Sequence, residues 1–207
     1  MNIERPRTRI QKKNREAILE AALEVFSNEG FRGATLDQIA AAAGLSKPNV
    51  LYYFSSKEAI YTELLSVLLD TWLDPLRALT GSGEPIEEIV GYVQRKLEMS
   101  REFPRESRLF ANEIVQGAPR IADQIEGPLK ALVDEKAGVI RSWIANGQLA
   151  EINPYHLIFS IWATTQHYAD FDVQVRGILA PDGDGHFSDA AGFLTSFYSR
   201  ALRPDSG

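Results

Sequence analysis

Residues 35–61 read TLDQIAAAAGLSKPNVLYYFSSKEAIY, and they constrain the fold of this chain more than any other stretch. Thr35 is placed to cap a short helix, with Gln38 three residues later as its capping-box partner. Gly44 suits the left-handed turn that ends such a helix, and Ser46 is placed to cap a second one. Two short helices joined by a glycine-centred turn predict a helix-turn-helix, whose second helix can enter the major groove of DNA.

Helical periodicity dominates the rest of the chain, and we find no alternating apolar–polar segments bounded by hairpin turns. The pattern, together with caps and breaking residues, predicts an all-α protein of about nine helices. Besides the helix-turn-helix, we expect a helix that Gly30 ends, a long helix from Ser55 or Ser56 to about Leu73, and helices over about 85–101, 104–117, a stretch ending at 146–147, 153–178 and 187–202.

Charge is distributed unevenly along the 207 residues. Residues 1–57 hold nine Lys and Arg against six Asp and Glu, a net charge of +3, whereas the whole chain carries −6. A phosphate-binding surface is therefore expected in the first quarter of the chain. We predict an N-terminal arm and helix-turn-helix DNA-binding domain over 1–55, and a helical effector-binding and dimerisation domain over 56–207.

Other classes of protein lack support in the sequence. The chain has no cysteine, which excludes disulfides and a cysteine nucleophile, and no apolar run reaches the roughly 18 residues of a membrane span. The basic N-terminus lacks the apolar segment of a signal peptide, so we expect a cytoplasmic protein. No nucleophile elbow, P-loop or Rossmann glycine pattern occurs, so neither an enzyme nor a cofactor is expected. His167 and Asp170 are too few to hold a metal.

Several residues are candidates for DNA contact. The basic residues near the N-terminus form an arm for phosphates or the minor groove, unless they are a solvated tail. Lys47 and Asn49 open the second helix, where Lys can read guanine and Asn adenine. Thr35 and Ser46 either only cap their helices or also aim backbone N–H groups at phosphate. The candidates are Arg7, Arg9, Lys12, Thr35, Ser46, Lys47, Asn49, Tyr52, Tyr53 and Lys57.

Alternatives stay open for the aromatic and lysine candidates. Of Tyr52 and Tyr53, one is expected to be partly buried while the other donates its hydroxyl to phosphate. Lys57 begins the long helix, where a cation opposes the helix dipole. A nearby DNA phosphate would explain it, although a solvated lysine remains an alternative.

These residues resemble the TetR family of bacterial transcriptional regulators. The family pattern Ser-x-Gly-x-Leu-Tyr-Tyr-His-Phe-x-Ser-Lys-Glu aligns without gaps to residues 46–58. Ser46, Tyr52, Phe54, Ser56, Lys57 and Glu58 match it, whereas Pro48, Val50, Leu51 and Tyr53 depart from it. Because Leu51 stands where the first tyrosine would be, the phosphate contact moves to Tyr52 or Tyr53, or is lost.

More of the chain is similar to the RutR-type repressors within that family, which regulate pyrimidine catabolism and respond to uracil. The similar segments are KPNVLYYFSSKEAIY at 47–61, DTWLDPL at 70–76, SREFPRESRLF at 100–110 and WATTQHYADF at 162–171. The resemblance implies a repressor of a palindromic operator whose effector is uracil or thymine. It also implies a homodimer through residues 153–202. We expect the apolar surface for that interface from Ile158, Ile161, Phe187, Phe193, Leu194 and Phe197.

The residues themselves offer a place for a flat ligand. Phe159, Trp162 and Gln166 share one helical face, and the Gln166 amide matches the N–H and C=O edge of a pyrimidinedione. Trp162 and Trp72 can stack on a ring, although both can equally be core residues. Lys96, Asn112 and Glu113 are polar positions that would complete the pocket. Three alternatives remain: an unrelated small-molecule effector, a protein effector and an enzyme.

Overall fold

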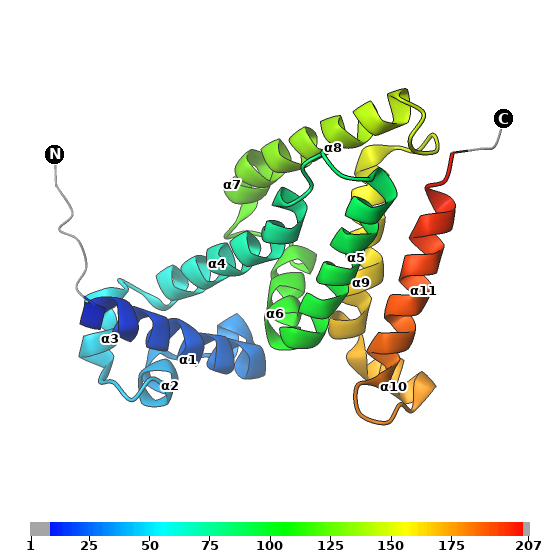
Figure 1. The fold of residues 1–207 in the computed structure, drawn as a ribbon. Helices are drawn as coiled ribbons and strands as arrows, with labels where there is room; N and C mark the ends of the chain where they lie inside the picture. Colours follow the sequence, from blue (N-terminus) through cyan, green and yellow to red (C-terminus); the bar gives the residue numbers. More distant parts are fainter. Residues whose placement is uncertain (1–8, 205–207) are drawn as a thin grey trace, which may run out of the picture. The chain divides into compact units, whose positions relative to one another are not determined.

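The computed structural model describes residues 9–204, and within that range all regular secondary structure is helical (Figure 1). The all-α prediction is therefore confirmed. Ten α-helices have seven or more residues. The three-residue α7 (Ala122–Gln124) and one π-helical turn lie between the sixth and the seventh of them. The chain divides into two compact units, Met1–Leu68 and Leu69–Gly207, which we call the N-terminal and C-terminal units. In the described part of the chain, no helix has the length and apolar character needed to cross a membrane.

The N-terminal unit packs three helices and the start of a fourth around one small core. The helices are α1 (Arg9–Gly33), α2 (Leu36–Ala42), α3 (Lys47–Tyr53) and the first three turns of α4 (Lys57–Arg77). α2 and α3 are the predicted helix-turn-helix, and α1 packs against α2. Fully buried apolar side chains come from every element, namely Ile18, Phe26, Ile39, Val50 and Ile60.

Two glycines and one serine set the ends of these helices. Gly30 was predicted to end the first helix; with φ 67° it breaks the helical conformation there, and α1 resumes as far as Gly33. Gly44 has φ 65°, the left-handed conformation required by the turn between α2 and α3. Ser56 caps α4, because its Oγ accepts a hydrogen bond from the Ala59 N–H at 3.0 Å.

α4 runs past Leu73, where its end was expected. Pro75 lies inside the helix, which continues to Arg77. The Arg77 guanidinium donates to the carbonyl oxygen of Asp70 at 2.9 Å and to the carboxylates of Asp70 and Asp74, each at 2.7 Å. The carbonyl that loses its helical donor at Pro75 is that of Thr71, so the Arg77 contacts hold the last turns together without replacing the missing bond.

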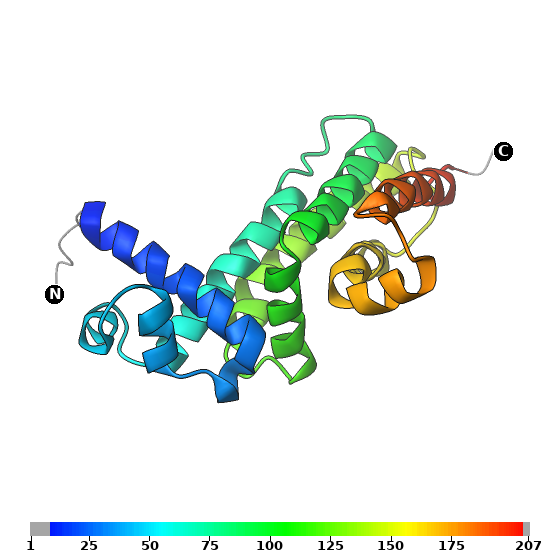
Figure 2. The same ribbon diagram turned by 90° about the horizontal axis from the view of Figure 1, so that it is seen from below.

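The C-terminal unit is built around α5 (Pro85–Glu102), which packs against both α9 (Pro154–Asp170) and α11 (Gly185–Ala201) (Figure 1, Figure 2). α6 (Pro104–Val115) and α8 (Lys130–Ala145) also pack against α9. Gly127 and Pro128 lie in the π-helical turn Ile125–Leu129, which directly precedes α8. The core of this unit includes Leu97, Ile140, Trp143, Ile158 and Tyr198.

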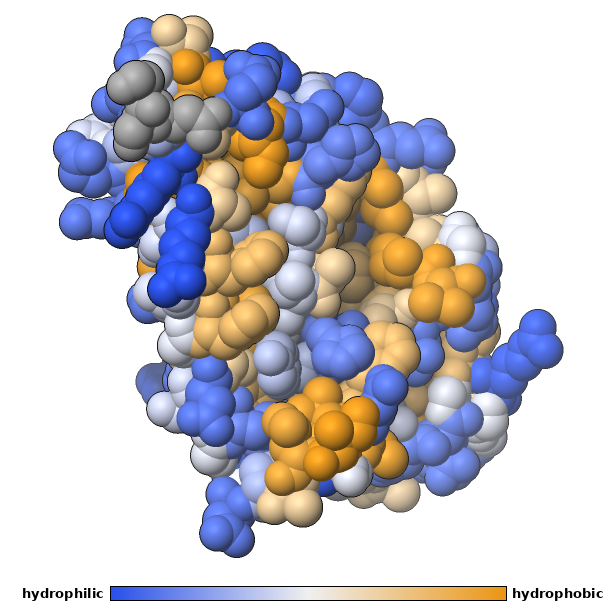
Figure 3. Space-filling view, turned by 90° about the vertical axis from the view of Figure 1, so that its right-hand side faces the viewer, coloured by the Kyte–Doolittle hydropathy of each residue, from blue (hydrophilic) through white to orange (hydrophobic). Residues whose placement is uncertain are grey.

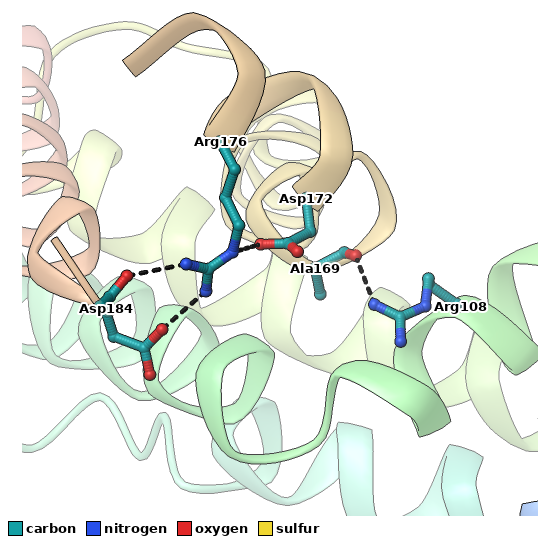
Figure 4. A network of polar contacts seen from close by, with 6 residues as sticks. Arg108, Ala169, Asp172, Arg176 and Asp184 are labelled. Atoms are coloured by element: carbon teal, nitrogen blue, oxygen red, sulfur yellow. Dashed lines mark hydrogen bonds and ion pairs between the residues drawn. The ribbon is translucent and has the colours of Figure 1, made fainter. Parts of the chain in front are cut away.

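The helix predicted over 153–178 is two helices, and this break accounts for the extra helix over the nine expected. α9 ends at Asp170 and α10 spans Asp172–Leu179, with Phe171 between them at φ −115°, ψ 28°. Figure 4 shows the contacts that hold the break. The Arg108 guanidinium of α6 donates to the Ala169 carbonyl at 3.3 Å, and Arg176 of α10 bonds Asp172 at 2.8 Å and Asp184 at 2.7 Å. Periodicity within 153–178 does not report these longer-range contacts.

Candidate DNA-binding surface and effector site

Caps at the helix-turn-helix form as the sequence predicted. The Thr35 hydroxyl oxygen accepts from the Gln38 N–H at 3.2 Å, and the Thr35 N–H donates to Gln38 Oε1 at 2.8 Å, which completes the capping box. Ser46 Oγ accepts from the Asn49 N–H at 3.4 Å and caps α3. Both caps are exposed, so each could meet a phosphate without unfolding its helix.

The first turn of α3 presents polar groups to solvent. Lys47, Pro48 and Asn49 are exposed, as the interpretation of α3 as the recognition helix requires. The Lys47 ammonium lies 2.9 Å from the carboxylate of Asp37, in the first turn of α2, with the two side chains 45% and 71% exposed. An exposed pair of this kind contributes little to stability, so the lysine can exchange its partner for a phosphate.

The two tyrosines differ in exposure, and both are held by amides of α1. Tyr52 is 71% exposed, and its hydroxyl oxygen accepts from Gln11 Nε2 at 3.2 Å. Tyr53 is half-buried, and its hydroxyl oxygen accepts from Asn14 Nδ2 at 2.9 Å. Because both hydroxyls accept these bonds, each keeps its own proton to donate. Exposure favours Tyr52 as the phosphate donor.

Lys57 has a role that sequence reasoning did not foresee. Its ammonium donates to the carbonyl oxygens of Phe31 and Ala34, both at 2.7 Å, and lies 4.6 Å from the centroid of the Phe31 ring. The lysine therefore ties the start of α4 to the C-terminal end of α1 and to the segment that joins α1 to α2. Neither a solvated lysine nor a cation directed solely at phosphate describes this arrangement.

The predicted basic arm is partly helical. Arg9 and Lys12 lie in the first turn of α1 and are exposed, and Lys13 follows them on the same helix. Arg, Lys and Gln are good helix formers, and no breaking residue separates them from the rest of α1. Arg7 lies outside the described residues. The N-terminal turn of α1 is thus a compact positive surface.

In the C-terminal unit, the three predicted ligand residues line one cavity. Trp72 of α4 and Trp162 and Gln166 of α9 lie around a space of about 50 Å³. The remaining lining residues are Leu69, Leu73, Lys96, Phe110 and Leu129. A space of this size holds one or two waters, so a ring-sized ligand would need the lining side chains to move apart.

Polar groups of this cavity are mostly donors. The buried indole N–H of Trp72 has no hydrogen-bond partner among the described residues. The Lys96 ammonium lies 4.6 Å from the centroid of the Trp72 ring. By contrast, Trp162 Nε1 donates to the Tyr92 hydroxyl at 2.6 Å, which leaves the face of its ring for stacking. A ligand with carbonyl acceptors on a flat ring would satisfy these donors.

Burial shapes the electrostatics of the cavity. Lys96 is 3% exposed, and burial lowers its pKa to about 8, against an opposing attraction from Asp170. Burial raises the pKa of Asp170, while the Ser107 hydroxyl, which donates to it at 2.6 Å, opposes that rise. The cavity therefore holds one cation whose charge is costly unless a ligand acceptor meets it.

Of the three polar positions expected to complete the pocket, only Lys96 lines it. Glu113 is buried, but its two carboxylate oxygens accept from the backbone N–H and the guanidinium of Arg120, each at 3.1 Å. Asn112 is exposed. His167 stacks on Phe171 at 5.0 Å between ring centroids, and no cluster of three potential metal ligands occurs among the described residues.

The expectation about the apolar dimer surface was partly wrong. Ile158, Ile161, Phe187 and Leu194 are buried within the protomer, because the inner faces of α9 and α11 pack on α5. Phe193 and Phe197 are exposed, at 62% and 49%, as is Phe159 of α9. Figure 3 shows hydrophobic side chains gathered on the face of the molecule that carries α10 and α11. Phe193, Ser196, Phe197, Arg200 and Ala201 line a groove of about 480 Å³ there.

Comparison with known proteins extends over nearly the whole chain. Residues 18–64 match the family model described as bacterial regulatory proteins of the tetR family, and residues 65–205 match the C-terminal region of YcdC-like protein. The chain is 51% identical over 172 residues to the HTH-type transcriptional regulator RutR of Escherichia coli strain K12, which covers 83% of this chain and 81% of that protein. It is 31% identical over 140 residues to the HTH-type transcriptional repressor NicS of Pseudomonas putida, covering 66% and 64% of the two chains.

Solved structures share the fold at lower identity. A putative transcriptional regulator of Streptomyces coelicolor, SCO4942, has a TM-score of 0.73 at 22% identity and covers 92% of this chain and 99% of its own. The ketosteroid transcriptional regulator KstR2 of Mycobacterium tuberculosis has a TM-score of 0.72 at 21% identity, covering 92% and 95%. Together with the helix-turn-helix, the two family-model matches and the 51% identity with RutR show that the chain belongs to the TetR family and is a ligand-responsive, DNA-binding transcriptional regulator rather than an enzyme.

Proposed function

We propose that this regulator is a repressor that leaves a palindromic operator when it binds uracil or a closely related planar pyrimidine. The observation that carries the proposal is the meeting of Trp72, Trp162 and Gln166 around one cavity. Two indole rings provide stacking faces, and the amide provides both a donor and an acceptor. Lys96 and the Trp72 N–H add donors for the ring carbonyls.

The DNA-binding half of the proposal rests on α3 as the recognition helix. Lys47 and Asn49 would reach base edges or phosphates from its first turn, while Thr35, Ser46 and Tyr52 would contact phosphates. Arg7, Arg9 and Lys12 would add contacts from the N-terminal end, and Tyr53 and Lys57 would act mainly by holding the helices in place. A protein with such a surface would act at the nucleoid.

The assembly would be a homodimer through residues 153–202. Exposed Phe193 and Phe197 beside the groove on α11, with exposed Phe159 on α9, support this surface. Two-fold symmetry would place the two recognition helices about 34 Å apart, in successive major grooves of a palindrome.

Signal transfer would run along α4, which is continuous from Lys57 to Arg77. One end is fixed to the DNA-binding helices through Lys57, and the other carries Trp72 into the cavity. A hundredfold loss of operator affinity needs only about 2.7 kcal/mol of coupling, which a small change in recognition-helix spacing can supply.

The first test is a titration of the purified protein with uracil, followed by tryptophan fluorescence. We expect a saturable quench, and Gln166→Ala should weaken binding by roughly 1–3 kcal/mol. Trp143 is buried in the core of the same unit, and uracil should leave its contribution to the tryptophan fluorescence unchanged. No response up to millimolar uracil would remove the pyrimidine effector. A protein or an unrelated small molecule would then be the effector, and the family assignment would stand.

A further inference from the structure

We propose that Arg15 is the positioning residue through which α4 sets the orientation of the recognition helix α3. The inference rests on the proposed effector response, and it identifies the connection inside the N-terminal unit that this response would use. Arg15 lies on α1, and its side chain is only 16% exposed. It was not a candidate from the sequence, since one arginine in a basic segment carries no signal of its own.

The guanidinium of Arg15 joins three helices at once. Its Nε donates to Glu63 Oε1 on α4 at 2.7 Å, and Nη2 donates to the other oxygen of the same carboxylate. Nη1 donates at 2.9 Å to the carbonyl oxygen of Tyr53, the last residue of α3. Its Cζ lies 4.0 Å from the centroid of the Phe54 ring, and Phe54 is the buried C-cap of α3.

Two of these contacts, with the Tyr53 carbonyl and the Phe54 ring, act on the end of the recognition helix. A terminal carbonyl has no partner within its own helix, and a cation at that end also suits the helix dipole. Asn14, next to Arg15, donates to the Tyr53 hydroxyl at 2.9 Å, and Gln11, one turn earlier, donates to the Tyr52 hydroxyl at 3.2 Å. One face of α1 therefore holds the C-terminal turn of α3 through three side chains.

Arg15 itself is poorly suited to contact DNA. Three of its N–H groups are already bonded within the protein, and its plane is covered on one side by Phe54. Its influence on operator binding must therefore act through the placement of Tyr52, Asn49 and Lys47 on α3. Lysine cannot replace it, because an ammonium cannot bond a carboxylate through two oxygens, bond a carbonyl and stack flat on a ring together.

Glu63 connects this cluster to the effector end of α4. Trp72, which lines the cavity, follows Glu63 by nine residues in the same helix, a rise of about 13 Å. A movement of α4 at Trp72 would shift Glu63, and the two-pronged bond would carry the shift to Arg15 and the α3 terminus. Charge-assisted bonds of this kind are strong and directional, which suits them to this transfer.

The test compares Arg15→Lys and Glu63→Gln with the parent, using a duplex selected from a random pool by the parent protein. Operator Kd is measured at several KCl concentrations, with and without uracil, alongside the thermal unfolding midpoint. For Arg15→Lys we expect Kd to rise about tenfold with only a small fall in the midpoint. Uracil should weaken operator binding less in both variants than in the parent, so the ratio of Kd with uracil to Kd without it should approach one. A residue that only stabilised the fold would leave this ratio unchanged.

Lys12→Ala is the matched control, since Lys12 is exposed on the same helix. It should raise the operator Kd and reduce the slope of log Kd against log[KCl] by about 0.9, which corresponds to the loss of one phosphate contact. The ratio of Kd with uracil to Kd without it should stay as in the parent. The proposal would be overturned if Arg15→Lys and Glu63→Gln both bound the operator with the Kd of the parent and both released it on adding uracil as the parent does. If Arg15→Lys fails to fold, Glu63→Gln decides alone. If uracil never releases the parent, the proposed effector fails, and the change in Kd still decides the positioning role of Arg15.

Discussion

The two units of this regulator differ in how completely their polar side chains are hydrogen-bonded. In the N-terminal unit, the partly buried Arg15 and Lys57 bond a carboxylate or backbone carbonyls, and the exposed Thr35 bonds Gln38. In the C-terminal unit, the Trp72 N–H and both ring nitrogens of His186 are buried without partners among the described residues. Unpartnered buried groups cost free energy, so their presence marks a region shaped for something other than its own stability.

This difference follows from what each unit has to do. A helix-turn-helix must present α3 in one orientation, so its polar groups are used to fix helix ends. In the proposed effector cavity, the ligand would supply the missing acceptors, so donors there would stay available until it binds. Removing a partnered polar group should therefore destabilise the protein, whereas removing the buried charge of Lys96 beside the cavity should stabilise it.

The largest effect is expected from Lys57→Met, which keeps most of the side-chain length and removes the ammonium. Two carbonyl oxygens, of Phe31 and Ala34, would lose their donor. We expect the free energy of unfolding to fall by about 2–4 kcal/mol in urea titrations followed by circular dichroism. Lys12→Met, at an exposed site, should change it by less than about 0.5 kcal/mol. Unchanged stability with lost operator affinity would instead make Lys57 a phosphate ligand.

In the C-terminal unit, Lys96→Met should stabilise the protein by roughly 1–3 kcal/mol, because a buried charge is replaced by an apolar chain of similar length. Uracil affinity should fall in the same variant. Lys136→Met is the matched control, because Lys136 is also buried but donates to the Leu79 carbonyl at 2.9 Å. That control should be destabilising. If Lys96→Met and Lys136→Met destabilised the protein equally, the proposed difference in hydrogen bonding between the two units would be wrong.

The pH dependence of the C-terminal unit gives a smaller but independent effect. Burial lowers the pKa of Lys96 from its ordinary value of 10.5 to about 8. Between pH 8 and pH 10.5 the unfolded chain therefore binds more protons than the folded one. Folding stability from this group therefore rises as pH increases above 8. Uracil binding should do the reverse and weaken about tenfold from pH 7 to 9, since the neutral amine is a poorer donor. Isothermal titration at several pH values measures this, and Lys96→Met should remove that part of the dependence.

The sequence predicted the N-terminal unit more completely than the C-terminal one, for a physical reason. Caps and turns are local, so Thr35, Gly44 and Ser46 could be assigned from their neighbours alone, and the structure confirms them. The break at Phe171 depends on contacts from Arg108 and on Arg176 with Asp184, which lie outside the predicted helix or beyond its pattern.

Prediction of the site residues likewise succeeded where local spacing was enough and failed where packing between helices decided. Trp72, Trp162 and Gln166 were expected together and do line one cavity, but of the three polar positions expected to complete it only Lys96 lies there. Helical spacing also identified apolar faces without saying what covers them. For this reason Ile158 and Leu194 were assigned to a dimer surface, although they are core residues of the protomer.

The smallest expected effect concerns Asp37, the exception to the stabilising pattern of the N-terminal unit. Its pair with Lys47 is exposed and contributes little to folding, yet it holds a lysine that DNA would use. Asp37→Asn should tighten operator binding by about three- to tenfold and steepen the salt slope by up to about 0.9, as Lys47 becomes free for phosphate. The cost should be about 0.3–1 kcal/mol of stability, because Asp37 favours the N-terminus of α2.

Glu16→Gln, an exposed acid on α1, controls for the change in net charge. If both variants tighten binding equally, general electrostatics explains the effect and the pair with Lys47 is incidental. If Asp37→Asn weakens binding, Asp37 must hold Lys47 in its binding position or accept a hydrogen bond from a base itself. The exposed pair would then belong with the fixed contacts of Arg15 and Lys57, and every polar group compared in the N-terminal unit would serve to position α3.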